Sequence, residues 1–473
     1  ARSERRRSER LLRQLVRSQR LAALGQVTAG LAHELSDPLT YLLHELETLD
    51  EQLPVQARAC EAGKGKIMIN GNEAAGLGAI YAGATVASWY PITPSTSLVE
   101  AFEKHANRLR KDDKGNVRAA VIQAEDELSA IGMAIGANWN GARAFTATSG
   151  PGISLMSEFL GLAYFAEIPV VLFDIQRGGP SSGMPSRTQQ SDILSCAYAS
   201  HGDTRHVLLF PADPAECFAH AADAFDLAER LQTPVIVLSD LDIGMNDWVV
   251  EPLEWSKDRV HDRGKLLDAE ALEAISDFAR YRDVDGDGIG YRTAPGTHPD
   301  RGAFFTRGTS HNEYGGYTED GELHARTLDR LSRKFDTAAG IVPKPVVRTL
   351  SAKSRLGVIN IGSTDLAVRE ALERFASEGH GLNHMRIRAF PFTEEVTQFI
   401  DNHDFLFVVE QNRDAQLRTL LTAEAEIPGE KLVPILNYDG MPLTASGICD
   451  AIRAVLNSNP QVEEAVAAPL TVA

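Results

Sequence analysis

The stretch of sequence that decides the fold reads Tyr90-Pro91-Ile92-Thr93-Pro94-Ser95-Thr96-Ser97 and follows a strand-like apolar run. Pro91 and Pro94 both exclude a helix, and each proline pushes the residue before it towards extended backbone. A helix is predicted directly afterwards, because Ser97 and Glu100 have the spacing of a capping box. We therefore expect Thr93 to display its hydroxyl between the end of a strand and the start of a helix, where open α/β sheets bind ligands.

Alternating strand-like and helical patterns surround this turn. The strand-like runs lie at 66–70, 119–122, 144–146, 169–173, 206–210 and 234–238. The helical patterns lie at 127–138, 154–166 and 214–231. Such alternation predicts an α/β fold whose mostly parallel sheet carries helices on both faces.

The same alternation returns in smaller form near the C-terminus. Strands are predicted at 356–361, 385–389, 405–410 and 432–435, and helices at 366–375 and 415–423. We therefore divide the chain into a helical extension (1–64), a first α/β domain (65–253), a connecting region (254–350) and a second α/β domain (351–473).

Composition limits the functional classes. The 473 residues are 43% hydrophobic and 24% charged, as in soluble globular proteins. The net charge of −18 argues against nucleic acid as a partner, and no apolar run is long enough for a membrane span. No secretory signal is visible, and Cys60, Cys196, Cys217 and Cys449 form no CxxC pair. We expect reduced thiols in a cytoplasmic protein that holds no four-cysteine iron–sulfur cluster of its own.

Two motifs imitate known sites but are better explained structurally. Gly76-Leu77-Gly78 suggests a dinucleotide fingerprint, yet the third position falls on Tyr81, so close helix–strand packing is favoured. Asp283-Val284-Asp285-Gly286-Asp287-Gly288 imitates a calcium loop and also a diphosphate–Mg²⁺ motif. Its twelfth position is Ala294 rather than glutamate, so we predict a surface loop.

Three further segments follow the Thr93 turn in order: 124–133 (AEDELSAIGM), 146–152 (TATSGPG) and 176–183 (QRGGPSSG). Together with that turn they resemble the α subunit of 2-oxoacid:ferredoxin oxidoreductases, especially the 2-oxoglutarate type. The resemblance runs from about Lys66 to the C-terminus. It implies a thiamine-diphosphate-binding-type (pyrimidine) domain, followed by a smaller domain like the C-terminal domain of transketolase.

The resemblance implies thiamine diphosphate chemistry, in which a carboxylic acid beside the pyrimidine ring activates the cofactor. Glu127 stands at the matching helix start, and Glu125 and Asp126 compete for the role. Apolar followers of Glu127 predict a partly desolvated carboxyl. A helix cap is the better interpretation of Asp126. Residues of the proline-rich turn, namely Tyr90, Pro91 and Ile92, are expected to line the cofactor.

Substrate binding requires a cation for the carboxylate of a 2-oxo acid. Arg177 follows a predicted strand, and a guanidinium binds a carboxylate bidentately. The resemblance assigns Thr93 a hydrogen bond to the same carboxylate, and Ser149 and Gly150 are expected to line the pocket. The distal carboxylate of 2-oxoglutarate has three candidate partners: Arg187, His201 and Arg307.

The resemblance also implies partners. A β subunit would supply the diphosphate–Mg²⁺ site and the iron–sulfur cluster, in an assembly of the α2β2 type, and a γ subunit would be present where the γ domain is a separate chain. The expected reaction is oxidative decarboxylation of 2-oxoglutarate to succinyl-CoA, with coenzyme A as acceptor and ferredoxin reduced, or the reverse. Pyruvate and branched-chain 2-oxo acids are alternative substrates.

The first sixty residues have a sequence pattern different from that of the α/β regions. Arginines at 2–20 precede apolar positions at helical spacing, which predicts an amphipathic helix that needs a partner. Within it, 33–39 (HELSDPL) resembles the phosphoacceptor box of histidine-kinase dimerisation domains, with His33 as phosphoacceptor. Asp37 replaces the usual asparagine, and no ATP-binding domain follows. A dimerising or vestigial extension is favoured, and a signalling protein remains the alternative.

Overall fold

The computed structural model describes residues 63–458, and residues 1–62 and 459–473 lie outside the description. The chain divides into two compact units, Ala1–Lys64 and Gly65–Ala473, and the described residues belong almost entirely to the second. The phosphoacceptor hypothesis for His33, the predicted helical extension and Cys60 all fall outside the described residues.

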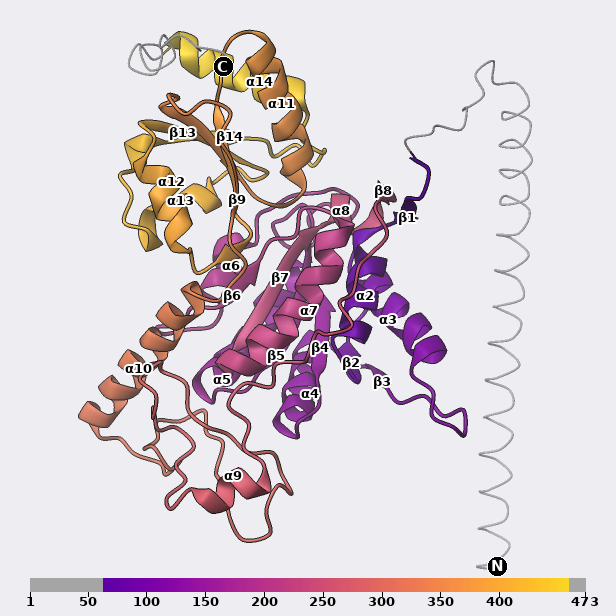
Figure 1. Ribbon diagram of the computed structural model, residues 1–473, viewed down its shortest axis with the longest axis vertical. Coiled ribbons are helices and arrows are strands. Elements are labelled where there is room, and N and C mark those ends of the chain that lie inside the picture. The colour runs from indigo at the N-terminus through magenta and orange to yellow at the C-terminus, as the bar shows by residue number, and fades with distance from the viewer. Residues whose placement is uncertain (1–62, 459–473) are drawn as a thin grey trace, which may run out of the picture. The chain divides into compact units, whose positions relative to one another are not determined.

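The larger α/β body is built on a seven-stranded sheet (Figure 1). Its strand order is β12-β6-β7-β5-β4-β2-β3, and every neighbouring pair is parallel except β12 with β6. The strands are β2 (Val86–Trp89), β3 (Ala120–Gln123), β4 (Ala144–Thr148), β5 (Val170–Gln176), β6 (Val207–Leu209), β7 (Pro234–Asp240) and β12 (Ala389–Phe390). Strands β4, β5, β6 and β7 are buried along their whole length, as expected of a sheet covered on both faces.

Helices cover both faces of this sheet. On one face α2 (Gly71–Tyr81), α3 (Thr96–Leu109) and α7 (Pro214–Leu231) pack together, and α4 (Glu127–Trp139) packs on α5 (Gly150–Phe165). Right-handed crossovers put α4 and α5 on the opposite face, because the chain moves along the sheet in the opposite direction through them. Two short helices, α6 (Ile193–Ala197) and α8 (Leu241–Met245), complete this body.

The smaller α/β body contains a five-stranded sheet in the order β14-β13-β10-β11-β9. Only β9 (Val346–Arg348) is antiparallel to its neighbour; the others are β10 (Leu356–Asn360), β11 (Asn383–Arg386), β13 (Phe405–Glu410) and β14 (Leu432–Leu436). Its helices are α11 (Asp365–Ser377), α12 (Glu394–Asp401), α13 (Gln416–Glu424) and α14 (Ala445–Ser458), with single 3₁₀ turns η2 (Gly362–Thr364) and η3 (Gly429–Lys431). The predicted α/β fold class, with two parallel sheets, is confirmed. The domain boundaries remain a prediction.

Three local expectations differ from the structure. The strand predicted at 66–70 leaves the main sheet, because β1 (Ile67–Ile69) pairs antiparallel with β8 (Trp248–Val250) in a separate two-stranded sheet. The strand predicted at 385–389 is split between β11 in the smaller sheet and β12, which pairs with β6 in the larger sheet. Arg386 at the end of β11 binds the carboxylate of Glu216 on α7 at 2.6 and 2.9 Å. Gly76 and Gly78 let α3 and α7 approach α2, so they serve helix–helix rather than helix–strand packing.

The connecting region contains α9 (Ala269–Ala274) and α10 (Gly321–Ala339) and is held to the larger body by buried charges. Glu167, which follows α5, is fully buried and accepts hydrogen bonds from Arg330 (3.0 Å) and Lys334 (2.9 Å) on α10. Burial opposes ionisation of this carboxyl, but Arg330 and Lys334 outweigh it and lower the pKa of Glu167. The carboxylate therefore stays charged and anchors α10.

In the described part of the chain, no helix combines the length and apolar character needed to cross a bilayer.

Replacing Glu167 by glutamine should destabilise the chain by about 3–5 kcal/mol, because Arg330 and Lys334 would keep buried charges without a partner. Urea unfolding measures the loss. The control is Glu158→Gln, whose side chain is 75% exposed and only 3.6 Å from His201; it should change stability by less than about 0.5 kcal/mol. Equal effects of both substitutions would contradict the anchoring role.

Candidate active site

The proline-rich turn lies at the carboxyl end of β2, as predicted. Thr93 is exposed, and no described residue forms a hydrogen bond with its hydroxyl, so this group is free for a ligand. The predicted capping box is wrong. Helix α3 begins at Thr96 with Ser95 as N-cap, and the hydroxyl of Ser97 accepts a hydrogen bond from the buried Asn72 at 2.8 Å. Asn72 also donates a hydrogen bond to the carbonyl of Pro94 at 2.8 Å, so Asn72 fixes the turn in place of a capping box.

Arg177 joins this turn to the end of β5. It is 8% exposed, and it donates from Nη1 to the carbonyl of Thr93 at 2.5 Å and from Nη2 to the carbonyl of Ser182 at 3.2 Å. These bonds use two of the five N–H groups of a guanidinium. Nε is buried without a partner. Arg177 therefore has donors left for a ligand while its position is fixed by the backbone.

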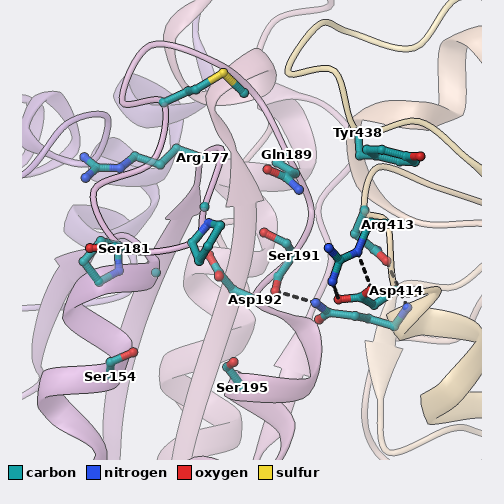
Figure 2. Close-up of a pocket in the computed structure, with 17 residues that line it drawn as sticks. Ser154, Arg177, Ser181, Gln189, Ser191, Asp192, Ser195, Arg413, Asp414 and Tyr438 are labelled. Carbon is teal, nitrogen blue, oxygen red and sulfur yellow. Dashed lines mark hydrogen bonds and ion pairs between the residues drawn. The ribbon is translucent and has the colours of Figure 1, made fainter.

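A cavity of about 480 Å³, called the edge cavity below, lies at the carboxyl ends of both sheets (Figure 2). Arg177 and Asp192 line it from the larger body, and Arg413, Asp414 and Tyr438 line it from the smaller body. Arg413 is bound to Asp414 at 2.7 and 3.1 Å, so its charge is already compensated. Among the charged groups that line this cavity, Arg177 is thus the cation that forms no ion pair with a described residue.

The start of α5 forms one wall of the edge cavity. Ser149 is the N-cap of α5, and its fully buried hydroxyl has no hydrogen-bond partner. A Cβ atom on Gly150 would lie 2.7 Å from both carboxylate oxygens of Asp192, so any other residue at this position would have to displace that carboxylate. Gly150 lines the cavity, whereas Ser149 lies just outside its lining.

Glu127 occupies the first turn of α4 and is 7% exposed. Its carboxylate has no hydrogen-bond partner among the described residues. A Cβ atom on Gly152 would lie 3.1 Å from Cγ of Glu127, which places this carboxyl against the first turn of α5. Asp126 is the N-cap of α4 and accepts a hydrogen bond from the amide of Ser129 at 2.7 Å, as the capping interpretation predicts. Glu125 is exposed.

The larger body also buries unpaired acidic groups below the edge cavity. Burial, together with the charge of Asp192, raises the pKa of Asp174 well above its usual range. Burial raises the pKa of Asp192 to about 6, against the opposing effect of Arg177. The thiol of Cys196 lies 3.5 Å from Asp174, and burial raises its pKa too. Such shifts are typical of functional sites.

Comparison with known proteins identifies the family. The family described as "Pyruvate flavodoxin/ferredoxin oxidoreductase, thiamine diP-bdg" matches residues 77–280. The chain is 34% identical over 375 residues to 2-oxoglutarate synthase subunit KorA of Methanothermobacter thermautotrophicus, which covers 77% of this chain and 93% of that protein. The chain belongs to the family of 2-oxoacid:ferredoxin oxidoreductase α subunits. The predicted resemblance is thereby confirmed.

Longer relatives and a solved structure agree with this membership. The α subunit of 2-oxoacid:ferredoxin oxidoreductase 2 of Aeropyrum pernix is 35% identical over 414 residues, covering 84% of this chain but only 62% of the relative's length. The solved 2-oxoglutarate:ferredoxin oxidoreductase of Magnetococcus marinus superposes with a TM-score of 0.77 at 30% identity, covering 86% of this chain and 69% of that one. The chain thus spans less than two thirds of some α-subunit relatives.

The site residues predicted for this α subunit do not all converge on the edge cavity. Arg177 and Gly150 line it, and Thr93 is tied to Arg177 through its carbonyl. Glu127 packs against α5 at Gly152 and is not part of the cavity lining. Tyr90 and Pro91 are exposed and Ile92 is half-buried at the same turn, so their contact with a cofactor stays a prediction.

Of the three candidates for a distal carboxylate, only Arg187 lies near the edge cavity, where Nη1 donates to the sulfur of Met441 at 3.5 Å. His201 is exposed beside Glu158 at a different cavity. Arg307 donates to the carbonyl of Gly315 within the connecting region.

Sequence patterns did not reveal Asp192 or the segment that carries it. Gln190 donates to the carbonyl of Gln411 (2.8 Å) and accepts from Asn412 (3.0 Å). The polar end of β13 therefore holds the segment that carries Asp192. An isolated Ser-Asp pair carries no recognisable periodicity, so only the packing of the two sheets could expose its role.

Within residues 63–458, no cluster of histidine, cysteine and acidic side chains has the form of a metal site. The loop that imitates a calcium site is a surface loop whose acids are paired within the chain. Lys265 binds Asp285 at 2.6 Å and Asp287 at 2.8 Å, and Arg333 binds Asp283 at 2.8 Å.

Replacing Gly152 by alanine should destabilise the chain by about 1–3 kcal/mol and displace Glu127. The new methyl group would lie 1.9 Å from Oγ1 of Thr148 and 3.1 Å from Cγ of Glu127. The matched control is Gly136→Ala in α4, where a Cβ atom meets nothing within 4 Å. That substitution should stabilise the helix by about 0.5–1 kcal/mol. Urea unfolding compares the two; a neutral Gly152→Ala would contradict the close packing.

Proposed function

We propose that this chain is the α subunit of a 2-oxoglutarate:ferredoxin oxidoreductase that acts only together with a β subunit. The reaction is oxidative decarboxylation of 2-oxoglutarate to succinyl-CoA with reduction of ferredoxin, or the reverse. The observation that carries the proposal is the contact of Arg177 with the Thr93 turn beside a cavity at the carboxyl edge of the sheet. This edge is where α/β folds bind ligands.

Glu127 is the group that would face the pyrimidine ring of thiamine diphosphate. The fit rests on the position of Glu127 in the first turn of α4, where the side chain is 7% exposed and its carboxylate forms no hydrogen bond with another described residue. When bound, the cofactor supplies the carbanion chemistry of decarboxylation. Glu127 holds or releases the proton at its carboxyl oxygen, and Gly152 leaves the room that this side chain occupies.

Arg177 would hold the carboxylate of the 2-oxo acid. Its backbone contacts fix the guanidinium before the substrate arrives, so little conformational entropy is lost on binding. The free hydroxyl of Thr93 lies on the same turn and would donate a second hydrogen bond. Ser149 and Gly150 would shape the wall at the start of α5.

A β subunit is proposed to complete the site. Near Glu127 in the sequence, Ile122 (39% exposed), Leu128 (38%) and Met133 (45%) are exposed apolar side chains, and we take them as candidates for contact with a partner. The partner would supply Mg²⁺, the diphosphate contacts and an iron–sulfur cluster, in an α2β2-type assembly with a γ subunit where this is separate. Relatives named as α subunits support the presence of other chains.

The choice of 2-oxoglutarate and coenzyme A rests on relatives. Three matched proteins are named 2-oxoglutarate synthase subunit, and the solved relative is described with 2-oxoglutarate, coenzyme A and succinyl-CoA bound. Pyruvate and branched-chain acids are the alternatives. A cytoplasmic location fits the described cysteines, Cys196, Cys217 and Cys449, which are buried and unpaired.

Turnover by the reconstituted complex tests the proposal. The chain is combined with its β subunit, thiamine diphosphate, Mg²⁺, coenzyme A and an electron acceptor, and four 2-oxo acids are compared. We expect kcat/KM to be highest for 2-oxoglutarate, and neither chain alone to turn over. Preference for pyruvate would reassign the substrate, and turnover by this chain alone would refute the shared site.

Replacing Glu127 by glutamine in the complex should lower kcat by about 10²- to 10⁴-fold, since glutamine cannot transfer the proton. The control is Glu125→Gln, because this neighbour is exposed and carries the same charge. Its kcat should stay close to that of the wild type. A larger loss for Glu125→Gln than for Glu127→Gln would move the catalytic role to Glu125.

A further inference from the structure

Asp192 is a partly buried acid at the edge cavity to which the proposed function gives no task. The residue lines the cavity together with Arg177 and Gly150, and Figure 2 shows it between Arg177 and the smaller body. Its backbone amide donates to Oε1 of Gln176 at 3.1 Å, which fixes it against the end of β5. The backbone of Asp192 therefore has a defined position at the cavity that Arg177 also lines.

The carboxylate of Asp192 is poorly satisfied. Oδ2 is shielded from solvent and has no hydrogen-bond partner, and both oxygens press on the position where Gly150 lacks a Cβ atom. An ionised carboxylate in such surroundings is costly unless a cation or donors compensate it.

Arg177 does not fully compensate this carboxylate. The described structure forms no ion pair between the two side chains, and Arg177 spends two N–H groups on the carbonyls of Thr93 and Ser182. Their charges nevertheless interact, since Arg177 opposes the rise in the pKa of Asp192. The unused donors of Arg177 are the ones that a substrate carboxylate would need.

Other charged groups around Asp192 do not replace Arg177 as its partner. Asp174 on β5 and Cys196 on α6 carry no positive charge, and the charge of Asp192 raises the pKa of both. Arg413 on the smaller body is paired with Asp414. Asp240 on β7 binds Ser363 and Gln190 instead. The wall formed by the start of α5 contributes Gly150, Pro151 and Ser154, none of which is charged.

We infer that Asp192 is a positioning residue whose charge competes with the substrate carboxylate for the free donors of Arg177, so that protonation of Asp192 strengthens substrate binding. The inference rests on the proposed role of Arg177 in holding a carboxylate. It also assigns a reason for the raised pKa of about 6, because a carboxyl that titrates near neutrality can release Arg177 within the range of cellular pH.

The charge effect has a definite sign. Well above pH 6 Asp192 is mostly ionised and repels an incoming carboxylate, and well below pH 6 it is mostly neutral and the repulsion disappears. Binding of the carboxylate should therefore draw a proton onto Asp192 in between. Burial and the charge of Asp192 raise the pKa of the neighbouring Asp174, so the neutral form of Asp174 is favoured as well.

Calorimetric titration of 2-oxoglutarate into the αβ complex freed of thiamine diphosphate tests the inference without turnover. The Kd is measured from about pH 5.5 to about pH 8 for the wild type and Asp192→Asn, which keeps the shape of the side chain. At about pH 7.5 the variant should bind about tenfold more tightly, and the difference should shrink to less than about threefold at pH 5.5.

Proton uptake gives a second measurement that needs no variant. Titrations in two buffers with different ionisation enthalpies should show uptake by the wild type near about pH 6.5 and none by Asp192→Asn. The matched control is Asp242→Asn on α8, because burial also raises the pKa of this acid but it lies outside the cavity lining. It should retain the Kd and the proton uptake of the wild type.

Weaker or unchanged binding by Asp192→Asn, or a wild-type Kd that does not vary with pH, would overturn the inference. Failure of both the wild type and Asp192→Asn to bind 2-oxoglutarate would overturn it too. The proposed function fails separately, through absence of turnover by the complete complex. Tighter binding by Asp192→Asn in a complex without turnover would keep the inference and reject the function; turnover with no effect of Asp192 would do the reverse.

Discussion

The bond from the guanidinium of Arg177 to the carbonyl of Thr93 is the contact on which the site depends. The two residues follow β5 and β2, which are not neighbours, because β4 lies between them in the sheet. Adjacent strands are about 4.8 Å apart, so the arginine side chain and its hydrogen bond together must reach across about 10 Å of the sheet edge. Arginine is long enough for this distance. The loop after β4, with Ser149 and Gly150, is thereby enclosed between the two outer loops, and three chain segments form one wall.

Buried charge is handled in opposite ways in the two parts of the larger body. Glu167 is surrounded by donors, and its ion pairs with Arg330 and Lys334 hold the connecting region in place. At the carboxyl edge of the sheet, by contrast, Asp192, Ser149 and Arg177 each keep a buried polar atom without a partner. Unsatisfied polar groups cost stability, so a protein retains them where a ligand or a proton will satisfy them. Polar atoms without partners also occur elsewhere in the described chain, Nε of Arg280 among them, so the three at this edge matter for their position at or beside the edge cavity.

Much of this arrangement follows from local sequence, and the remainder depends on long-range packing. Proline geometry placed the Thr93 turn, and apolar runs placed β5 and α7 with small errors at their ends. Periodicity could not show that β1 leaves the main sheet or that β12 crosses between bodies, because a strand of two or three residues carries no information about its partner. The sequence also could not show that Gly76 and Gly78 contact helices, since a glycine indicates close packing but not which element packs against it.

Asp192 lines the edge cavity although it belongs to none of the recognised sequence motifs. The segment before it is held by the smaller body through polar bonds, in which Gln190 contacts Gln411 and Asn412, and Gln416 donates to the carbonyl of Ser191 at 2.7 Å. The position of Asp192 beside Arg177 is therefore set by residues more than two hundred positions further along the chain. Polar contacts tolerate small displacements less well than apolar surfaces, because their strength depends on distance and angle. The smaller body thus acts on the charge balance of the cavity, and the two sheets function as one unit at their facing edges.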